Sequence, residues 1–350
     1  MVNKIISSVF LFILILSLNA CDKKPCCDTN PPETKIDSTG DIILLGNEGN
    51  FQWGNASLSY LDLNPQKAVF IKDIYKQQNQ KNLGDVLQSM VYWNNKVYLV
   101  INNSGKIEIL NPDDLKSIGS ITGFKSPRYM LPISNSKAYV SDLYKNAIYV
   151  VDINSREIKK EIQLKGWTEE MLLFNNKLYV CNKENQHLFI VNTLTDEIID
   201  SLNIGYGSAS ITIDHENKIW VSCSGKDNTY QGRIVKINPE NGQIQKEFIF
   251  PMNNAPGKLV FNTADKKIYY QFKDLYRMET NENALPNTPY IVSGNKNIYS
   301  FQLINDKTFV SDAKDFVQAS EISIYDNTTG NLDTSFFSGI NTSSFLKVSR

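Results

Sequence analysis

The sequence predicts an all-β protein, a seven-bladed β-propeller whose ring is closed by a C-terminal strand. Three observations lead to this prediction. Short runs rich in Val, Ile, Tyr and Phe alternate with polar residues, which is the period-two pattern of β-strands. The pattern recurs about every forty residues, and no helical stripe of useful length interrupts it. A last apolar run near the C-terminus has no partner strand in its own repeat.

Six repeats are visible along the chain. Each has a polar turn, a lysine, a short apolar run, a polar loop and a second apolar run that ends in an Asn, Asp or Pro turn. The spacings between the marker lysines are 41, 40, 41, 49 and 40 residues, for Lys96, Lys137, Lys177, Lys218, Lys267 and Lys307. Four short strands at this period are typical of a propeller blade.

A seventh unit precedes these six, and it lacks one strand. The runs "DIILL", "SLSYLDL" and "KAVFIKDI" supply its second, third and fourth strands. We expect the C-terminal run "SSFLKV", Ser343 to Val348, to supply the first strand, which closes the ring and covers edges that would otherwise promote aggregation. Six or eight blades also fit the pattern, because the unit around residues 275–292 is irregular.

The N-terminus predicts export and a lipid anchor. Residues 1–20 have the form of a signal peptide, with a lysine in "MVNK" followed by the ten-residue apolar run "VFLFILILSL". The next motif, "LNAC", resembles a bacterial lipobox that leaves Cys21 as the lipid-modified N-terminus; a soluble secreted protein is the alternative. Residues 21–40 are polar and contain proline, so we expect a flexible tether. Residues 41–350 then form the propeller.

The charge balance argues against nucleic acid as a partner. The chain has 36 basic and 37 acidic residues and a net charge of −1, without a block of like charge. No surface would therefore neutralise a row of phosphates.

Propeller topology separates the loops into two faces with different compositions. Connections from the second to the third strand, and from one blade to the next, lie on one face, and this face gathers the aromatic loop residues. The candidate ligand-binding residues on it are Phe51, Trp53, Asn55, Phe124, Arg128, Tyr144, Trp167, Tyr206, Lys226 and Tyr230. Aromatic rings there would contact a large flat or sugar-like ligand or a protein partner. The alternative is that the rings pack on neighbouring loops and cap the central channel.

The longest of these connections is "GNEGNFQWGNAS", Gly46 to Ser57. Its glycines allow sharp backbone turns and a close approach to a ligand. Phe51 and Trp53 are the two large aromatic residues that it carries.

The sequence contains no constellation typical of catalysis or of a metal site, so we expect neither an enzyme nor a cofactor. There are two histidines, His187 and His215, and neither has a neighbouring nucleophile or ligand cluster. Cys181 and Cys223 are expected to be buried free thiols. No spacing singles out a catalytic pair of carboxylates, although a propeller hydrolase or lactonase is an alternative.

The repeat "KAYVSDLYKNAIYVVDINSREIKKEIQLKG", Lys137 to Gly166, resembles the YncE-like propeller repeat. Together with the lipobox and the segment "NEGNF…GNASLSYLDL", it resembles the surface-exposed propeller lipoproteins of Bacteroidetes. That family includes members that capture vitamin B12 for a TonB-dependent transporter. The resemblance implies an outer-membrane lipoprotein, anchored by lipid at the cell surface. It also implies a corrinoid ligand and a TonB-dependent outer-membrane transporter as partner. An interaction or scaffold propeller of an envelope complex is the alternative.

Overall fold

The structure is a computed structural model that describes residues 40–62 and 69–350. These residues fall within one compact unit, residues 35–350. The predicted signal peptide, the lipidation at Cys21 and the tether up to residue 39 lie outside the described residues. No helix in the described part of the chain is long and apolar enough to cross a membrane.

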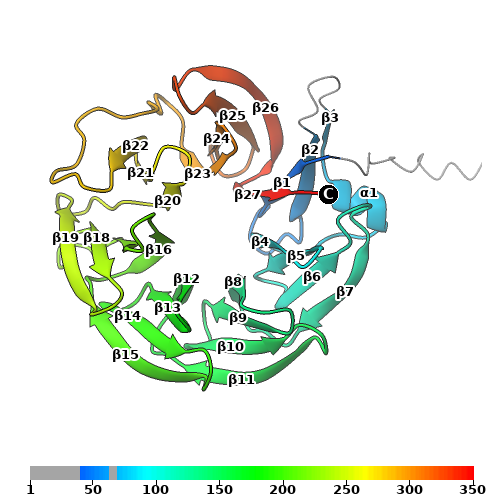
Figure 1. Cartoon of the computed structure of the whole chain (residues 1–350). Helices are drawn as coiled ribbons and strands as arrows, with labels where there is room; N and C mark the ends of the chain where they lie inside the picture. The colour runs from blue at the N-terminus through cyan, green and yellow to red at the C-terminus, as the bar shows by residue number, and fades with distance from the viewer. Residues whose placement is uncertain (1–39, 63–68) are drawn as a thin grey trace, which may run out of the picture. The chain divides into compact units, whose positions relative to one another are not determined.

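Seven antiparallel sheets surround a central channel, which confirms the predicted seven-bladed propeller (Figure 1). The strands of the first three blades, from the channel outwards, are β27 (Thr342–Val348), β1 (Ile42–Asn47), β2 (Ser57–Asp62) and β3 (Val69–Ile71); β4 (Leu87–Trp93), β5 (Lys96–Ile101), β6 (Lys106–Leu110) and β7 (Ser117–Thr122); and β8 (Pro127–Pro132), β9 (Lys137–Asp142), β10 (Ala147–Asp152) and β11 (Glu157–Gln163).

The other four blades follow in chain order. Their strands are β12 (Thr168–Phe174), β13 (Lys177–Asn182), β14 (His187–Asn192) and β15 (Glu197–Asn203); β16 (Ser208–Ile213), β17 (Ile219–Cys223), β18 (Arg233–Asn238) and β19 (Gln243–Ile249); β20 (Leu259–Asn262), β21 (Lys267–Phe272) and β22 (Asp274–Glu279); and β23 (Ile298–Ile304), β24 (Lys307–Asp312), β25 (Ala319–Asp326) and β26 (Leu332–Ile340).

The ring closes through the C-terminal strand, as predicted. β27 pairs antiparallel with β1, and Leu346 lies opposite Leu44. The innermost strand of the first blade therefore comes from the far end of the sequence. Pairing of this kind covers the inner edge of β1, which no other strand is placed to pair.

The irregular unit is the sixth blade, which has three strands rather than four. Between β22 and β23 the chain makes no regular strand, and Leu275 pairs with Ile291 in an isolated bridge, with Leu275 N 3.0 Å from Ile291 O. The segment after β22 thus takes the place of an outer strand at this one point.

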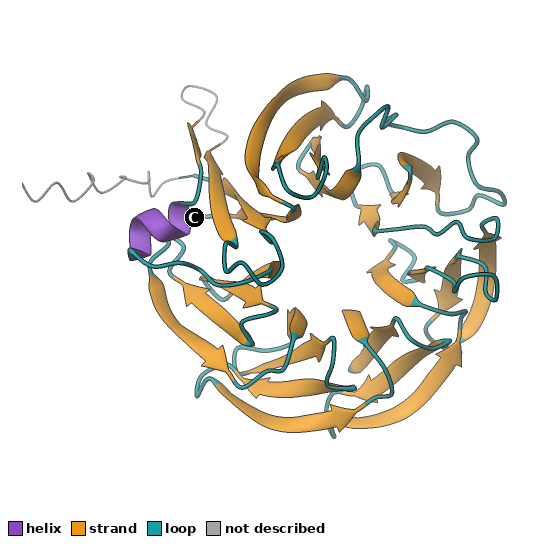
Figure 2. Ribbon diagram, turned by 180° about the vertical axis from the view of Figure 1, so that it is seen from behind, coloured by secondary structure: helices purple, strands orange, loops and turns teal. Residues whose placement is uncertain are grey.

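One short helix, α1 (Ile74–Asn79), lies between the first two blades (Figure 2). The alternating pattern did not predict it. Asp73 caps its N-terminus by accepting a bond from Lys76 N. Its Tyr75 hydroxyl donates to buried Glu108 of β6 at 2.9 Å, which ties the helix to the second blade.

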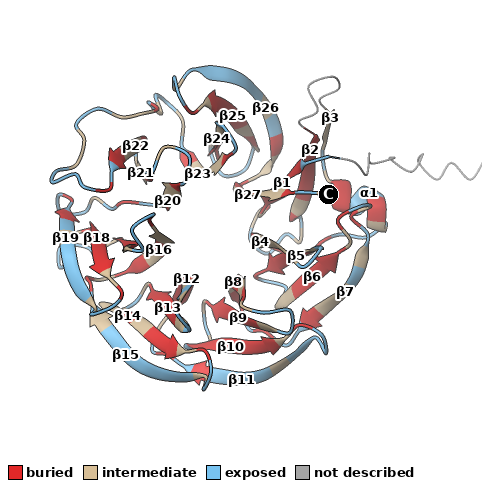
Figure 3. Ribbon diagram, viewed as in Figure 1, coloured by how far each residue is buried: buried red, intermediate tan, exposed pale blue. Residues whose placement is uncertain are grey.

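The core lies between neighbouring blades. The second and third strands of most blades are almost wholly buried, whereas outer strands such as β11 and β15 are mostly exposed to solvent (Figure 3). Hydroxyls also join the blades: Thr168 Oγ1 accepts from Asp142 N at 2.9 Å, and Ser208 Oγ accepts from Asn182 N at 2.8 Å.

Cys181 and Cys223 are buried free thiols, as expected. Both belong to the same hydrophobic cluster between the fourth and fifth blades. Their offset of one residue places them on opposite faces of their own blades. Because adjacent blades turn opposite faces towards each other, this offset brings the two thiols into one cluster.

Candidate functional site

The loops that join second to third strands, and one blade to the next, form one face of the ring, as the topology requires. This aromatic loop face comprises residues 48–56, 143–146, 183–186, 224–232 and 313–318, together with 123–126, 164–167 and 204–207. Strand β1 runs from Ile42 to Asn47 towards this face. The chain therefore enters the propeller from the opposite face.

The loop of residues 48–56 is held firmly at its base. Glu48 N and Gly49 N donate to Asn341 O and Ile340 O at 3.0 and 3.1 Å. Gly49 has a φ of 75°, and a Cβ there would lie 2.8 Å from the Asn55 carbonyl carbon, so only glycine fits. Asn50 Nδ2 donates to Phe316 O at 2.9 Å, which joins the loop to the seventh blade.

The same loop is also fixed on its other side. Gln52 N donates to Asp85 Oδ2 at 2.8 Å, and Ala56 N donates to Gly84 O at 3.1 Å. Asn55 Oδ1 accepts from Asn50 N at 2.8 Å. Asn55 therefore acts on the loop itself, by holding its two arms together. Asn55 is also exposed on the loop face, and its contact with a ligand stays a prediction.

This fixed loop presents two aromatic rings to solvent. The exposed fraction is 58% for Phe51 and 76% for Trp53. Phe316 and Val317 of the neighbouring loop and Tyr144 of the third blade are also exposed. Neither Phe51 nor Trp53 is among the residues that line the central cavity.

Phe124 departs from the expectation that it belongs to the binding face. Its ring is buried in the cluster between the second and third blades and meets Tyr149 edge-on, with the ring centroids 5.1 Å apart. A residue at the end of a blade-to-blade connection can turn either into the core or outwards, and Phe124 turns into the core.

Arg128, which was also expected on this face, does not lie on the loop surface. It is the second residue of β8, and its guanidinium points into the central channel, where Nη2 donates to Glu169 Oε1 at 2.9 Å. Trp167 lies over this guanidinium, with 5.2 Å between Arg128 Cζ and the ring centroid. Arg128 thus lines the channel below the loops, and Trp167 packs against it.

Tyr206, Tyr230 and Lys226 form a small cluster on the face at the fifth blade. The two tyrosine rings are stacked, 5.3 Å apart and inclined by 7°. Lys226 Nζ lies 5.2 Å from the Tyr206 centroid. These three predicted residues are brought together, on the opposite side of the fourth blade from Tyr144.

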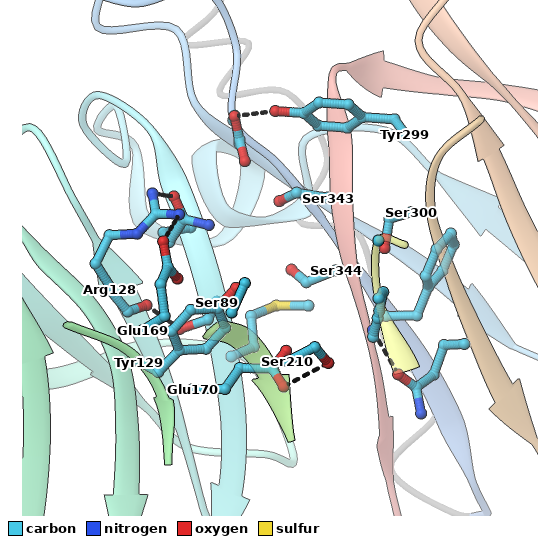
Figure 4. Close-up of a pocket in the computed structure, with 18 of the residues that line it drawn as sticks. Ser89, Arg128, Tyr129, Glu169, Glu170, Ser210, Tyr299, Ser300, Ser343 and Ser344 are labelled. Carbon is cyan, nitrogen blue, oxygen red and sulfur yellow. Dashed lines mark hydrogen bonds and ion pairs between the residues drawn. The ribbon is translucent and has the colours of Figure 1, made fainter. Parts of the chain in front are cut away.

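A polar cavity of about 550 Å³ lies in the channel below the aromatic loop face. Its wall carries six charged side chains: Glu48, Arg128, Glu169, Glu170, Lys183 and Lys258. Figure 4 shows Arg128 and Glu169 on one side of this axial cavity and the hydroxyls of Ser300, Ser343 and Ser344 on the other. The Oγ atoms of Ser300 and Ser344 are buried and have no hydrogen-bond partner among the described residues.

Recurrent β-bulges bring these polar residues to the channel. The inner strand shows a register shift in six of the seven blades, for example between Thr168 and Met171 and between Ser208 and Ser210. A bulge interrupts the alternation of side chains, so adjacent residues such as Glu169 and Glu170 both line the channel.

Apart from Arg128, sequence analysis missed these residues, although a signal was present. In the inner strands "LQSMV", "PRYML", "TEEML", "IYSFQ" and "TSSFL", a pair of adjacent polar or tyrosine residues breaks the period-two pattern at the same place.

Two of the cavity carboxylates are held by neutral donors. Glu48 accepts from the Tyr299 hydroxyl at 2.7 Å, and Glu170 accepts from Ser210 Oγ at 2.8 Å. Among the described residues no cationic group lies within 4 Å of either carboxylate. Burial raises the pKa of both Glu48 and Glu170 above the usual value for glutamate, because the charged form loses hydration.

One cavity lysine, in the same way, is bonded to a neutral acceptor. Lys258 Nζ donates to the neutral Gln302 Oε1 at 2.8 Å. Burial lowers the pKa of Lys258, and the negative charge of Glu170 opposes this shift. Charges of both signs in the axial cavity therefore lack a close ionic partner.

Solved structures with a similar fold are other propellers. A quinonprotein alcohol dehydrogenase-like protein from Bacteroides thetaiotaomicron is 14% identical over 89% of this chain and 79% of its own, with a TM-score of 0.71. The periplasmic gluconolactonase of Pseudomonas aeruginosa is 8% identical over 88% of this chain and 99% of its own, with a TM-score of 0.67.

A putative 6-phosphogluconolactonase from Bacteroides fragilis is 10% identical over 90% of this chain and 99% of its own, with a TM-score of 0.66. At such identities the likeness shows the fold alone. A search of curated protein sequences gives no significant match.

Sequence-family comparison gives a more specific result. The model of a domain of unknown function, DUF5074, matches residues 41–337. This range begins just before β1 and ends within β26, so it includes all seven sheets except for the closing strand. The chain belongs to the DUF5074 family.

Proposed function

We propose that this protein is a lipid-anchored binding protein of the outer membrane, which captures a ligand on its aromatic loop face and does not transform it. The observation that carries this proposal is the loop of residues 48–56. Its backbone is hydrogen-bonded to the loops of the first, second and seventh blades, yet it holds Phe51 and Trp53 in solvent. Exposed aromatic rings on a fixed backbone are typical of binding surfaces, because little conformational entropy is lost when a partner covers them.

The geometry of attachment is compatible with this role. Cys21 would carry the lipid, and the chain enters the propeller at the face opposite the aromatic loops. A ligand arriving from outside would then meet the aromatic face directly.

A corrinoid is the ligand that we propose, to be handed on to a TonB-dependent transporter. A corrinoid combines a large flat ring with amide side chains. Trp53, Phe51 and Tyr144 would contact the ring, and the polar mouth of the axial cavity would bond the amides. A whole corrinoid is larger than the axial cavity, so it would rest on the loops above it.

The test is isothermal titration of the full-length protein with cyanocobalamin and with cobinamide. The proposal expects saturable binding of at least one of them with a Kd in the micromolar range or tighter, which is the range of a specific site. Absence of binding to both would remove the corrinoid from the proposal.

One specific observation favours a second candidate, a protein partner. Phe51, Trp53, Phe316 and Val317 are all exposed on adjoining loops of the first and seventh blades. A cluster of exposed apolar residues of this kind also anchors protein interfaces. Chemical cross-linking in intact cells, with and without Trp53→Ala, separates this candidate from small-molecule capture.

A further inference from the structure

The axial cavity has features that the proposed capture on the loop face does not use. It lies in the channel and is lined by the inner strands of the blades. Its volume of about 550 Å³ is within the range of small-molecule sites, roughly 300–1,000 Å³. Its lining is polar and holds charges of both signs.

The charges divide into a satisfied pair and an unsatisfied set. Arg128 and Glu169 neutralise each other at 2.9 Å. The remaining set has two carboxylates, Glu48 and Glu170, and two ammonium groups, Lys183 and Lys258, with no ion pair of 4 Å or less among the described residues. The formal charge of this set is therefore zero, although none of its members has a close ionic partner.

The cavity residues also have hydrogen-bonding capacity that is not used. An ionised carboxylate offers about four acceptor positions, and Glu48 uses part of them for the hydroxyls of Tyr299 and Ser343. Lys258 has three N–H donors and one acceptor, Gln302. Ser300 is 5% exposed, lines the cavity, and its Oγ has no partner in the described part of the chain. These groups form a site with spare acceptors, spare donors and balanced charge.

We propose that the axial cavity is a binding site for a small zwitterion of the amino-acid class, whose ammonium group faces Glu48 and whose carboxylate faces Lys258. Such a ligand supplies these two charges with partners and adds no net charge to the site. Charge-assisted hydrogen bonds are the strong ones. A simple anion or a simple cation would satisfy one set of charges and be repelled by the other.

The first experiment titrates the full-length protein with each of the twenty common L-amino acids and follows both the melting temperature and the heat of binding. At least one of them is expected to raise the melting temperature and to bind with a Kd of about 1 mM or tighter. The best ligand is then compared with its N-acetyl derivative, which lacks the ammonium, and its carboxamide, which lacks the carboxylate. Each derivative is expected to bind about 10- to 100-fold more weakly.

Variants connect the binding to the cavity. Glu48→Gln and Lys258→Met are expected to weaken the best amino acid by about 10- to 100-fold, while Glu240→Gln, an exposed glutamate outside the cavity, has no effect. Melting temperatures near that of the wild-type protein show that each variant is folded.

Three results would overturn the inference: no binding by any of the twenty amino acids, equal binding of the blocked derivatives, or binding that the cavity variants leave unchanged. None of these measurements uses a corrinoid. Failure of the corrinoid titration and failure of this inference are therefore separate results.

Discussion

Replacing Phe345 with alanine should destabilise the propeller strongly, because this ring secures the strand that closes it. Phe345 lies in β27, is 7% exposed, and packs among Ile43, Leu45 and Phe309, with 5.7 Å between its ring centroid and that of Phe309. Truncation of a buried phenylalanine costs about 3–5 kcal/mol. Phe345 also borders the axial cavity, where water can enter the space left by the ring. We therefore expect the free energy of unfolding to fall by about 3 kcal/mol, the lower end of this range.

The assay is urea unfolding of the full-length protein, compared with a matched control. Phe337 is the same residue type on β26, the strand that precedes β27 in the chain, but it is 53% exposed. Its replacement by alanine should change the free energy of unfolding by less than about 1 kcal/mol. If the two variants lose the same stability, or if Phe345→Ala loses less than about 1 kcal/mol, β27 does not hold the ring together as described.

Three further predictions concern the anchor, the closing strand and the buried carboxylate of Glu108. Cys21→Ala should abolish lipid labelling and release the protein from the membrane fraction; persistent labelling would exclude Cys21 as the anchor. Deletion of residues 343–350 should lower the melting temperature sharply and promote aggregation, and a deletion variant that melts like the full chain would mean that the ring closes otherwise.

Burial acts to raise the pKa of Glu108, but hydrogen bonds from Lys106, Ser117 and Lys81 outweigh it and lower the pKa to about 2. Since the unfolded value is about 4.3, the contribution of Glu108 to stability is present above that pH. This contribution, about 3 kcal/mol in all, is lost as the pH falls towards 2. The slope of stability against pH in this window should be shallower in Glu108→Gln by the share of this one carboxyl group, and an unchanged slope would refute the assignment.

The fold was predictable because its signals are local and repeated. Period-two alternation and a forty-residue repeat define the blades, and an unpaired apolar run at the C-terminus has a single place in a ring that lacks one strand. Helix α1 was not predictable in this way. Its six residues are too few to show a helical period, and its stability comes from tertiary bonds such as that between Tyr75 and Glu108.

The site was predictable only in part. Topology identifies the face on which a loop lies, so the positions of Phe51, Trp53 and Tyr144 followed from the strand order. It does not decide whether a ring turns outwards, and Phe124 turns into the core. The axial cavity depends on bulges in the inner strands, which place Glu169 and Glu170 side by side in the channel. A bulge changes which residues face inwards, and a strictly alternating interpretation assigns one of every such pair to the wrong side.

The most direct test of ligand capture by the aromatic loop face is the affinity of the wild-type protein and two variants for cyanocobalamin. Trp53→Ala removes a ring that is 76% exposed on that face, and Leu194→Ala removes a side chain that is 77% exposed on the β14–β15 loop of the opposite face. Loss of a central aromatic contact is worth about 2–4 kcal/mol. We therefore predict about 30- to 1,000-fold weaker binding for Trp53→Ala, wild-type affinity for Leu194→Ala, and melting temperatures close to wild type for both. Wild-type affinity in the Trp53→Ala variant would contradict the account.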